Sequence, residues 1–203
     1  MVRLPINLQN PQQRIVKTAA NVLEEGGLVI YPTDTVYGLG CDLFNKKAIE
    51  RIYWIKGVKK RRRLSFICPD LKDIARYAQV PTPAYKLMRH LTPGPYTFIL
   101  EATREVPKIL LEKRKTVGIR VPDSALCHHL LEEFGRPVIS TSACPPDLEY
   151  LNDPEEIAGK FEYTVDLFLD AGWGGSELST VVDLTGAEPV ILRRGKAFDP
   201  ALF

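Results

Sequence analysis

A dense run of cations follows the first quarter of the chain. Six of the eight residues from Lys56 to Arg63 are lysine or arginine. Cations this close repel one another unless an anion lies among them, so the run predicts contact with phosphate groups. A solvated loop is the alternative explanation for any single side chain. If the chain binds RNA, we expect five of these residues to contact it: Lys59, Lys60, Arg61, Arg62 and Arg63.

A polar segment rich in hydroxyl groups precedes this run. Tyr31 to Gly40 reads Tyr-Pro-Thr-Asp-Thr-Val-Tyr-Gly-Leu-Gly and follows a short apolar stretch that is typical of a buried strand. Ligands of open α/β sheets usually bind at loops that leave the carboxyl ends of strands, and Gly38 and Gly40 permit close backbone approach. A simple strand-to-helix turn is the alternative, but a turn alone does not need so many polar groups.

Short hydroxyl side chains and two arginines mark the ends of later strands. Ser140-Thr141-Ser142 follows Val138-Ile139, and Ser179-Thr180 precedes an apolar run. With Arg120 and Arg193 they form a plausible set of donors for an anionic ligand, although each hydroxyl alone is more often a cap. The chain has no Walker A motif and no Gly-x-Gly-x-x-Gly, which argues against the common P-loop and Rossmann nucleotide sites.

Helical and strand patterns alternate along the chain and predict an α/β fold with a mixed or mainly parallel sheet. No repeat, low-complexity tract or linker divides the sequence, so one domain over 1–203 is expected. The predicted helices are 11–25, 48–55, 71–78, 84–91, 124–134 and 154–161. The predicted strands are 28–31, 64–68, 97–100, 117–121, 138–140, 167–169, 180–184 and 190–192.

Composition favours a soluble globular protein. The 203 residues are 45% hydrophobic and 26% charged, and their net charge is only +2, so attraction for a polyanion must depend on local clustering. We find no signal peptide and no apolar stretch long enough to span a bilayer, which predicts a cytoplasmic protein that does not contact membranes. Four scattered cysteines and three histidines suggest neither disulfides nor a bound metal.

These segments resemble the YrdC/YciO family over nearly the whole chain, from Gly27 to Arg194. The resemblance implies a single-domain YrdC-like fold, in which helices flank a twisted mixed β-sheet that carries a basic cavity on one face. The motifs that carry it are Tyr-Pro-Thr-Asp-Thr-Val-Tyr-Gly-Leu at 31–39, Leu-Thr-Pro-Gly-Pro-Tyr-Thr-Phe at 91–98, Gly-Ile-Arg-Val-Pro at 118–122, Ser-Thr-Ser-Ala at 140–143 and Ser-Thr-Val-Val-Asp at 179–183.

The resemblance also implies an activity. Synthases of this family make threonylcarbamoyl-AMP from L-threonine, bicarbonate and ATP with Mg²⁺, release pyrophosphate, and so supply the threonylcarbamoyladenosine modification of tRNA. Catalysis would consist of positioning and charge stabilisation. By motif, Lys56 and Arg120 resemble catalytic residues. The residues that resemble threonine contacts are Thr35, Arg120, Ser140 and Ser179, and those that resemble nucleotide contacts are Lys56, Arg62, Thr116, Ser142 and Arg193.

Two positions depart from the family pattern. Val58 stands where the Lys-x-Arg signature has arginine, and Cys144 stands where the Ser-x-Asn signature has asparagine. Local details such as Glu105-Val106-Pro107 make the chain more similar to the YciO branch. A second hypothesis is therefore a protein that binds double-stranded RNA or tRNA through the same basic cavity, with weak or no synthase activity. Action on another adenylate or carbamoyl compound is a third.

Overall fold

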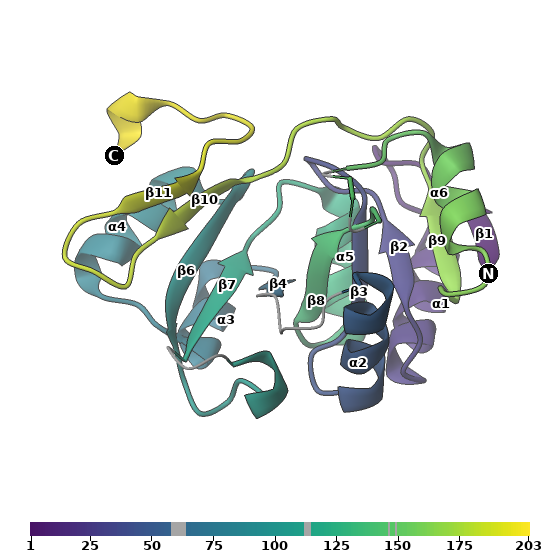
Figure 1. The fold of residues 1–203 in the computed structure, drawn as a ribbon, viewed down its shortest axis with the longest axis horizontal. Helices are drawn as coiled ribbons and strands as arrows, with labels where there is room; N and C mark the ends of the chain where they lie inside the picture. Colours follow the sequence, from purple (N-terminus) through teal and green to yellow (C-terminus); the bar gives the residue numbers. More distant parts are fainter. Residues whose placement is uncertain (58–63, 112–114, 146, 149) are drawn as a thin grey trace.

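The computed structural model describes residues 1–57, 64–111, 115–145, 147–148 and 150–203 (Figure 1). Helices and strands alternate as expected. The helices are α1 (Gln13–Glu24), α2 (Lys46–Ile55), α3 (Leu71–Tyr77), α4 (Thr82–Leu91), α5 (Ala125–Phe134) and α6 (Pro154–Phe161), with short 3-10 turns at Lys108–Leu110 and Pro200–Leu202. The strands are β1 (Val2–Pro5), β2 (Val29–Tyr31), β3 (Gly38–Asp42), β4 (Ser65–Ile67), β5 (Ala78–Gln79), β6 (Tyr96–Ala102), β7 (Thr116–Arg120), β8 (Val138–Ser142), β9 (Leu167–Asp170), β10 (Thr180–Asp183) and β11 (Val190–Arg193).

The strands form one mixed sheet in the order β1-β9-β2-β3-β8-β4-β7-β6-β10-β11, with β5 paired to β6. Strand β4 joins the two parts of this sheet, because it pairs antiparallel with β8 on one side and parallel with β7 on the other. Segments that are distant in sequence therefore become neighbours. Gly38 lies opposite Ser142, and Ser65 lies between Ser140 and Gly118.

Local sequence signals explain where several helices begin and end. The Asn45 side chain accepts a hydrogen bond from the Ala48 amide at 3.0 Å and so caps α2. Ser124 caps α5 in the same way, through the Cys127 amide. Gly135, with a φ of 75°, ends α5 in the left-handed conformation that glycine adopts at low cost.

Alternation along the strands divides the core into two clusters on opposite faces of the sheet. In β2, Val29 and Tyr31 pack with α1 and α5, whereas Ile30 packs in the larger cluster, which includes α2, α3, α4 and α6. This separation follows from the period of two along a strand. Helices α1 and α5 pack against one another and cover only part of their face, so the same face is open over β4, β7 and β6.

The predicted elements are present, with bounds that differ by at most two residues, and three strands were missed. The 31–40 segment was predicted as a loop, but β3 begins at Gly38 because its backbone pairs with both β2 and β8. The strand predicted at 138–140 extends two residues further, so Thr141 and Ser142 lie within β8 and do not follow it. Strand β1 pairs with β9, and β5 is a two-residue pairing with β6.

Candidate functional site

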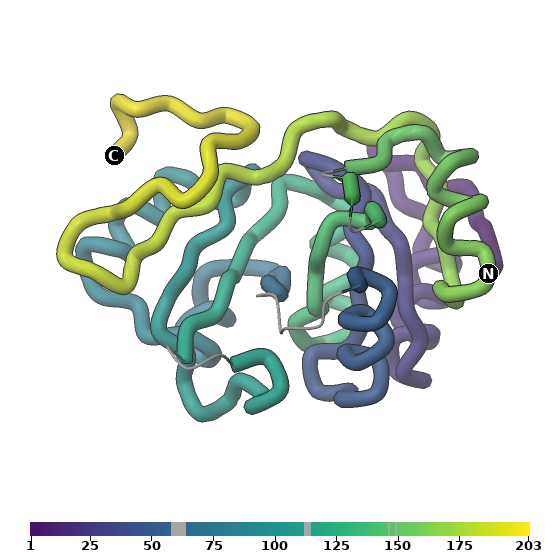
Figure 2. The backbone as a smooth tube through the Cα atoms, viewed as in Figure 1, coloured from purple at the N-terminus to yellow at the C-terminus, as the bar shows by residue number. Residues whose placement is uncertain are grey.

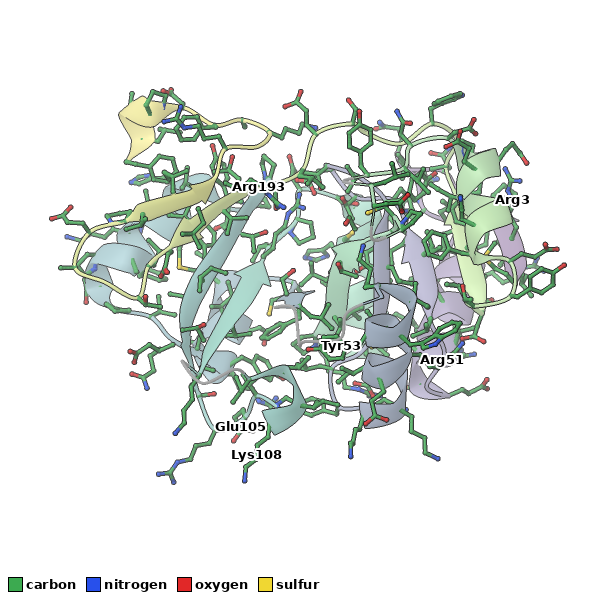
Figure 3. The ribbon with its side chains drawn as sticks, viewed as in Figure 1. Arg3, Arg51, Tyr53, Glu105, Lys108 and Arg193 are labelled. Atoms are coloured by element: carbon green, nitrogen blue, oxygen red, sulfur yellow. The ribbon has the colours of Figure 1, made fainter. Side chains whose placement is uncertain are left out.

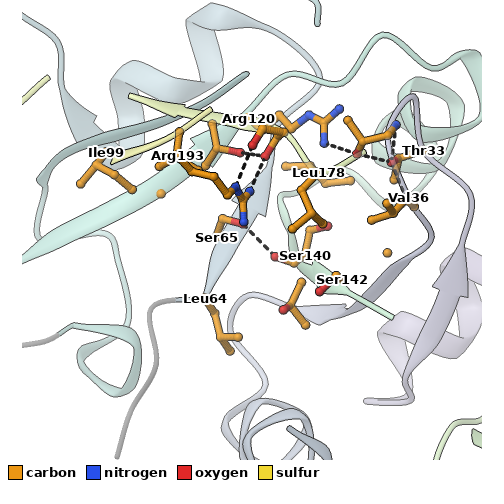
Figure 4. A pocket seen from close by; sticks show the side chains of 18 of the residues that line it. Thr33, Val36, Leu64, Ser65, Ile99, Arg120, Ser140, Ser142, Leu178 and Arg193 are labelled. Atoms are coloured by element: carbon orange, nitrogen blue, oxygen red, sulfur yellow. Dashed lines mark hydrogen bonds between the residues drawn. The ribbon is translucent and has the colours of Figure 1, made fainter. Parts of the chain in front are cut away.

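A cavity of about 280 Å³ opens on the uncovered part of this sheet face (Figure 4). Its volume is near the lower end of the range for small-molecule sites and suits a ligand of amino-acid size. Hydroxyl side chains and two arginines supply most of its polar groups. The described residues that do so are Thr33, Thr35, Ser65, Thr97, Arg120, Ser140, Thr141, Ser142, Ser179 and Arg193.

The strands build this lining by alternation. In β7, Gly118 and Arg120 lie on the cavity side, whereas Val117 and Ile119 belong to the apolar core behind the sheet. Strand β6 does the same, since Thr97 faces the cavity and Phe98 faces the core. Side chains two residues apart share one face of a strand. One face of the central sheet is therefore polar, although each strand by itself reads as largely apolar.

Arg120 is fixed on one wall of the cavity. Its guanidinium donates to the Gly94 carbonyl oxygen at 3.1 Å, to Thr35 Oγ1 at 2.8 Å and to Asp34 Oδ1 at 2.5 Å. The residue is only 8% exposed. With the described residues, Arg120 thus uses three of its five N–H groups. The other two could donate to a carboxylate or phosphate.

The Thr35 loop has its own hydrogen bonds. Thr33 Oγ1 donates to the Val36 carbonyl oxygen at 2.6 Å, accepts from the Thr35 amide at 3.1 Å, and lies 3.0 Å from Thr35 Oγ1. Side-chain hydroxyls that bond to nearby backbone in this way stabilise tight turns. Thr35 is thus held toward Arg120 before any ligand binds.

A second cluster forms the opposite wall. Ser179 Oγ lies 2.9 Å from Thr97 Oγ1 and accepts a 3.0 Å hydrogen bond from Arg193 Nη2. Arg193 Nε also donates to the Ser179 carbonyl oxygen at 2.9 Å. Arg193 lines the cavity and lies near the upper middle of the view, beside β10 and β11, whereas Arg3 and Arg51 lie at the right (Figure 3). Two arginines from different parts of the chain therefore flank one cavity.

Two buried tyrosines support the loop and β3. The Tyr31 ring lies so close to Gly40 that a Cβ there would come within 2.8 Å of it, which explains the need for glycine. The Tyr37 hydroxyl donates to the Gly172 carbonyl oxygen at 2.7 Å and accepts from the Ala171 amide. Burial raises the pKa of Tyr37 to about 12 and raises that of Tyr31 further. Both hydroxyls are thus neutral at physiological pH, so neither is a general base.

Lys56 contacts the end of β8, beside the cavity. Its ammonium donates to the carbonyl oxygens of Ser142 at 3.1 Å and Cys144 at 2.8 Å, and it lies 3.4 Å from Cys144 Sγ. The side chain is 9% exposed and does not belong to the cavity lining. In this conformation Lys56 supports the backbone that carries Ser142.

The structure brings together most of the predicted site residues. Thr35, Arg120, Ser140, Ser142, Ser179 and Arg193 all line the cavity. Thr116 is two residues from Gly118 along β7 and shares its face, but it lies beyond the lining, opposite Glu101. The predicted RNA contacts Lys59, Lys60, Arg61, Arg62 and Arg63, and the Val58 departure, lie outside the described residues.

Sequence reasoning missed several residues of the site. Asp34 was seen only as part of a polar segment, yet it forms the ion pair with Arg120. Thr97 and Ser65 were assigned to strands without a role in the cavity, although both line it. The period of two in β6 and β4 was the signal that could have identified them, because their neighbours are large and apolar.

Other candidate sites are less well supported. Among the described residues, no cluster of three or more His, Cys, Asp and Glu side chains could hold a metal ion. All four cysteines are buried free thiols, and burial raises the pKa of Cys127 to about 12. Within the described part of the chain, no helix is both long and apolar enough to cross a membrane.

The fold and the cavity define a class of protein: a mixed α/β domain with a cavity lined by hydroxyl side chains and two arginines on one face of its sheet. Residues 21–195 match the Sua5/YciO/YrdC family, which carries the description "Telomere recombination", and the chain belongs to this family. It is 44% identical over 192 residues to the uncharacterized protein YciO of Escherichia coli, with 94% of this chain and 93% of that protein covered. The resemblance predicted from the motifs is confirmed.

Solved structures and characterised relatives agree with this assignment. The crystal structure of E. coli YciO superposes with a TM-score of 0.93 at 43% identity and covers 97% of both chains. The structure of Pyrococcus abyssi Sua5 complexed with L-threonine gives a TM-score of 0.90 at 29% identity and covers 96% of this chain and 58% of that one. A threonylcarbamoyl-AMP synthase of Halorhodospira halophila is 33% identical over 88% of this chain and 94% of that protein.

Proposed function

We propose that this protein forms threonylcarbamoyl-AMP and pyrophosphate from L-threonine, bicarbonate and ATP. The observation that carries the proposal is the convergence of Thr35, Arg120 and Ser179 on one cavity of amino-acid size. A structural relative, P. abyssi Sua5, was solved with L-threonine, and this likeness favours the same ligand class here. The product would serve the threonylcarbamoyladenosine modification of tRNA.

The cavity suits threonine because it offers cations and hydroxyls together. We assign the carboxylate of threonine to the remaining N–H donors of Arg120, since guanidinium and carboxylate geometries match. We assign the hydroxyls of Thr35, Ser140 and Ser179, which line the cavity, to the polar groups of the amino acid. Apolar atoms of Ile67 and Val181 line the same cavity and suit the methyl group.

The reaction needs a carbamate and an electrophilic phosphorus. The threonine amine and bicarbonate give a carbamate and water; a carbamate oxygen then attacks the α-phosphorus of ATP, and the bond to the pyrophosphate leaving group breaks. We assign Arg193 and Ser142 to the phosphates, because both lie at the cavity and can donate to oxygen. Positioning would supply most of the rate, as is common in phosphoryl-type transfers.

Mg²⁺ would enter with ATP. Among the described residues that line the cavity there is no aspartate or glutamate, and the nearby Asp34 is paired with Arg120. Mg²⁺ in such sites is held largely by substrate phosphates and water. When bound, it would neutralise phosphate charge, and the side chains would position the two substrates around it.

The test is pyrophosphate release with all three substrates and with each one omitted. We expect release that requires both L-threonine and bicarbonate, and calorimetric binding of L-threonine that is lost in Arg120→Ala. The exposed helix residue Lys160, changed to alanine, is the matched control for removal of a cation. Absence of pyrophosphate above background, with all substrates present, would contradict the proposal.

The alternative function, binding of double-stranded RNA or tRNA, rests on the sequence of the 59–63 run. It predicts binding that weakens steeply as salt rises, because phosphate contacts release counterions. Neutralising Lys59, Lys60 and Arg61 together should then reduce RNA affinity without changing L-threonine affinity. RNA binding that is absent or insensitive to salt would reject this alternative.

A further inference from the structure

A lysine beyond the last strand ties the two walls of the cavity together. Lys196 Nζ donates a 2.6 Å hydrogen bond to the carbonyl oxygen of Asp34. Asp34 belongs to the loop that holds Arg120, whereas Lys196 follows β11 on the other side of the cavity. In Figure 2 the C-terminal segment, in yellow, first turns toward the β2–β3 side and then doubles back.

The backbone of Lys196 is fixed on the Ser179 wall. Its amide donates to the Leu178 carbonyl oxygen at 2.8 Å, and its carbonyl oxygen accepts from Thr180 Oγ1 at 3.1 Å. The preceding Gly195 permits this approach, because a Cβ there would overlap the Leu178 carbonyl oxygen. The backbone of Lys196 is therefore held in place while its side chain extends to Asp34.

The segment after Lys196 is anchored as well. The Tyr96 hydroxyl donates to the Ala197 carbonyl oxygen, and Phe203 packs near the rings of both Tyr96 and Phe198. Buried and stacked aromatic groups restrict a terminal segment that would otherwise fray. The lysine thus links the loop between β2 and β3 to the β10–β11 side, which the sheet connects only through β8, β4, β7 and β6.

We propose that Lys196 is a positioning residue, which holds the Asp34–Thr35 loop so that Arg120 is ready for the carboxylate of the ligand. The inference rests on the proposed function for the identity of that ligand, L-threonine. Lys196 does not itself contact the ligand in this proposal: it is absent from the cavity lining and acts through the Asp34 backbone. It lies just outside residues 21–195, which match the family.

Steady-state kinetics of Lys196→Ala and Lys196→Arg test the proposal. Loss of one hydrogen bond should raise the KM and calorimetric Kd for L-threonine in Lys196→Ala by roughly two- to tenfold. The KM for ATP should stay within about twofold, and Lys196→Arg, which restores a donor, should recover the L-threonine affinity. Lys160→Ala is the control. An unchanged KM for L-threonine, or an equal rise for both substrates, would overturn the proposal.

Hydrogen exchange separates this inference from the proposed function, because it needs no ligand. In Lys196→Ala the amides of residues 33–37 should exchange faster than in the unsubstituted protein, while those of α1 should not change. If exchange at residues 33–37 rises in Lys196→Ala but the unsubstituted protein binds no L-threonine, the proposed function is wrong, whereas the positioning role of Lys196 is supported. Unchanged exchange at residues 33–37 would overturn the positioning role of Lys196, whether or not the protein is a synthase.

Discussion

The two arginines at the cavity differ in how the protein holds them. Arg120 is 8% exposed and bonds to a carboxylate, a carbonyl oxygen and a hydroxyl, all before a ligand binds. Arg193 is exposed on the last strand of the sheet and donates to the carbonyl oxygen and the hydroxyl of Ser179. One arginine is preorganised in a site of low dielectric, and the other lies where water screens its charge.

This difference implies different roles. A preorganised guanidinium loses little entropy when it binds a carboxylate, so Arg120 suits recognition of the small, partly enclosed ligand. An exposed arginine can follow a longer and more mobile group, so Arg193 suits the phosphates of a nucleotide at the cavity mouth. In the proposed function, Arg120 would contribute to both stability and ligand recognition, whereas Arg193 would contribute mainly to recognition.

Removal of Arg120 should have the largest effect. In Arg120→Ala the Asp34 carboxylate remains buried without its cation, which should lower the free energy of unfolding by about 3–5 kcal/mol. L-threonine affinity should fall at least roughly 30-fold, because the charged donor is lost from a buried site. Urea unfolding and calorimetry measure the two effects. In Asp34→Ala/Arg120→Ala, stability should be partly recovered and affinity should not. Equal stability of the single and double variants would contradict the preorganised pair.

A larger residue at Gly175, which packs against the Thr35 loop, should have the second largest effect on stability. A Cβ at Gly175 would overlap the Thr35 carbonyl oxygen, so Gly175→Ala must displace one of the two segments. We expect a loss of about 1–3 kcal/mol in the free energy of unfolding, as for other overpacked sites. Gly159→Ala is the matched control: it lies in α6 with nothing within 4 Å and should stabilise by about 0.5–1 kcal/mol. Equal thermal shifts in both variants would refute this packing.

Removal of Arg193 should have the smallest effect on stability. Because the side chain is exposed, Arg193→Ala should lower the free energy of unfolding by less than about 1 kcal/mol. ATP affinity should fall about tenfold at low salt, and less at high salt, where screening weakens the contact. Arg194→Ala is the control, since Arg194 lies over the Phe198 ring, 5.1 Å from its centroid. A stability loss as large as that of Arg120→Ala would remove the distinction between the two walls.

Much of the fold was predictable because its signals are local. Helix α6 was predicted with its observed bounds, since Pro154 begins it and apolar residues recur at helical spacing. Strand β3 was missed because Gly38 and Gly40 read as turn residues, and their strand conformation depends on pairing with β2 and β8. The motif resemblance identified Arg120, Ser140, Ser142, Ser179 and Arg193, but it gave no sign that Lys56 would bond to the carbonyl oxygens of β8.

The sequence alone determined the α/β class, the family, both arginines of the cavity and several of its hydroxyls, because residue type and motif spacing encode them directly. Only the tertiary structure decided which side chains meet. Asp34 and Arg120 are 86 residues apart, and Lys196 and Asp34 are 162 apart. The order of strands in the sheet sets these encounters, and it depends on how the whole chain buries its apolar faces, a non-local property that no short motif records.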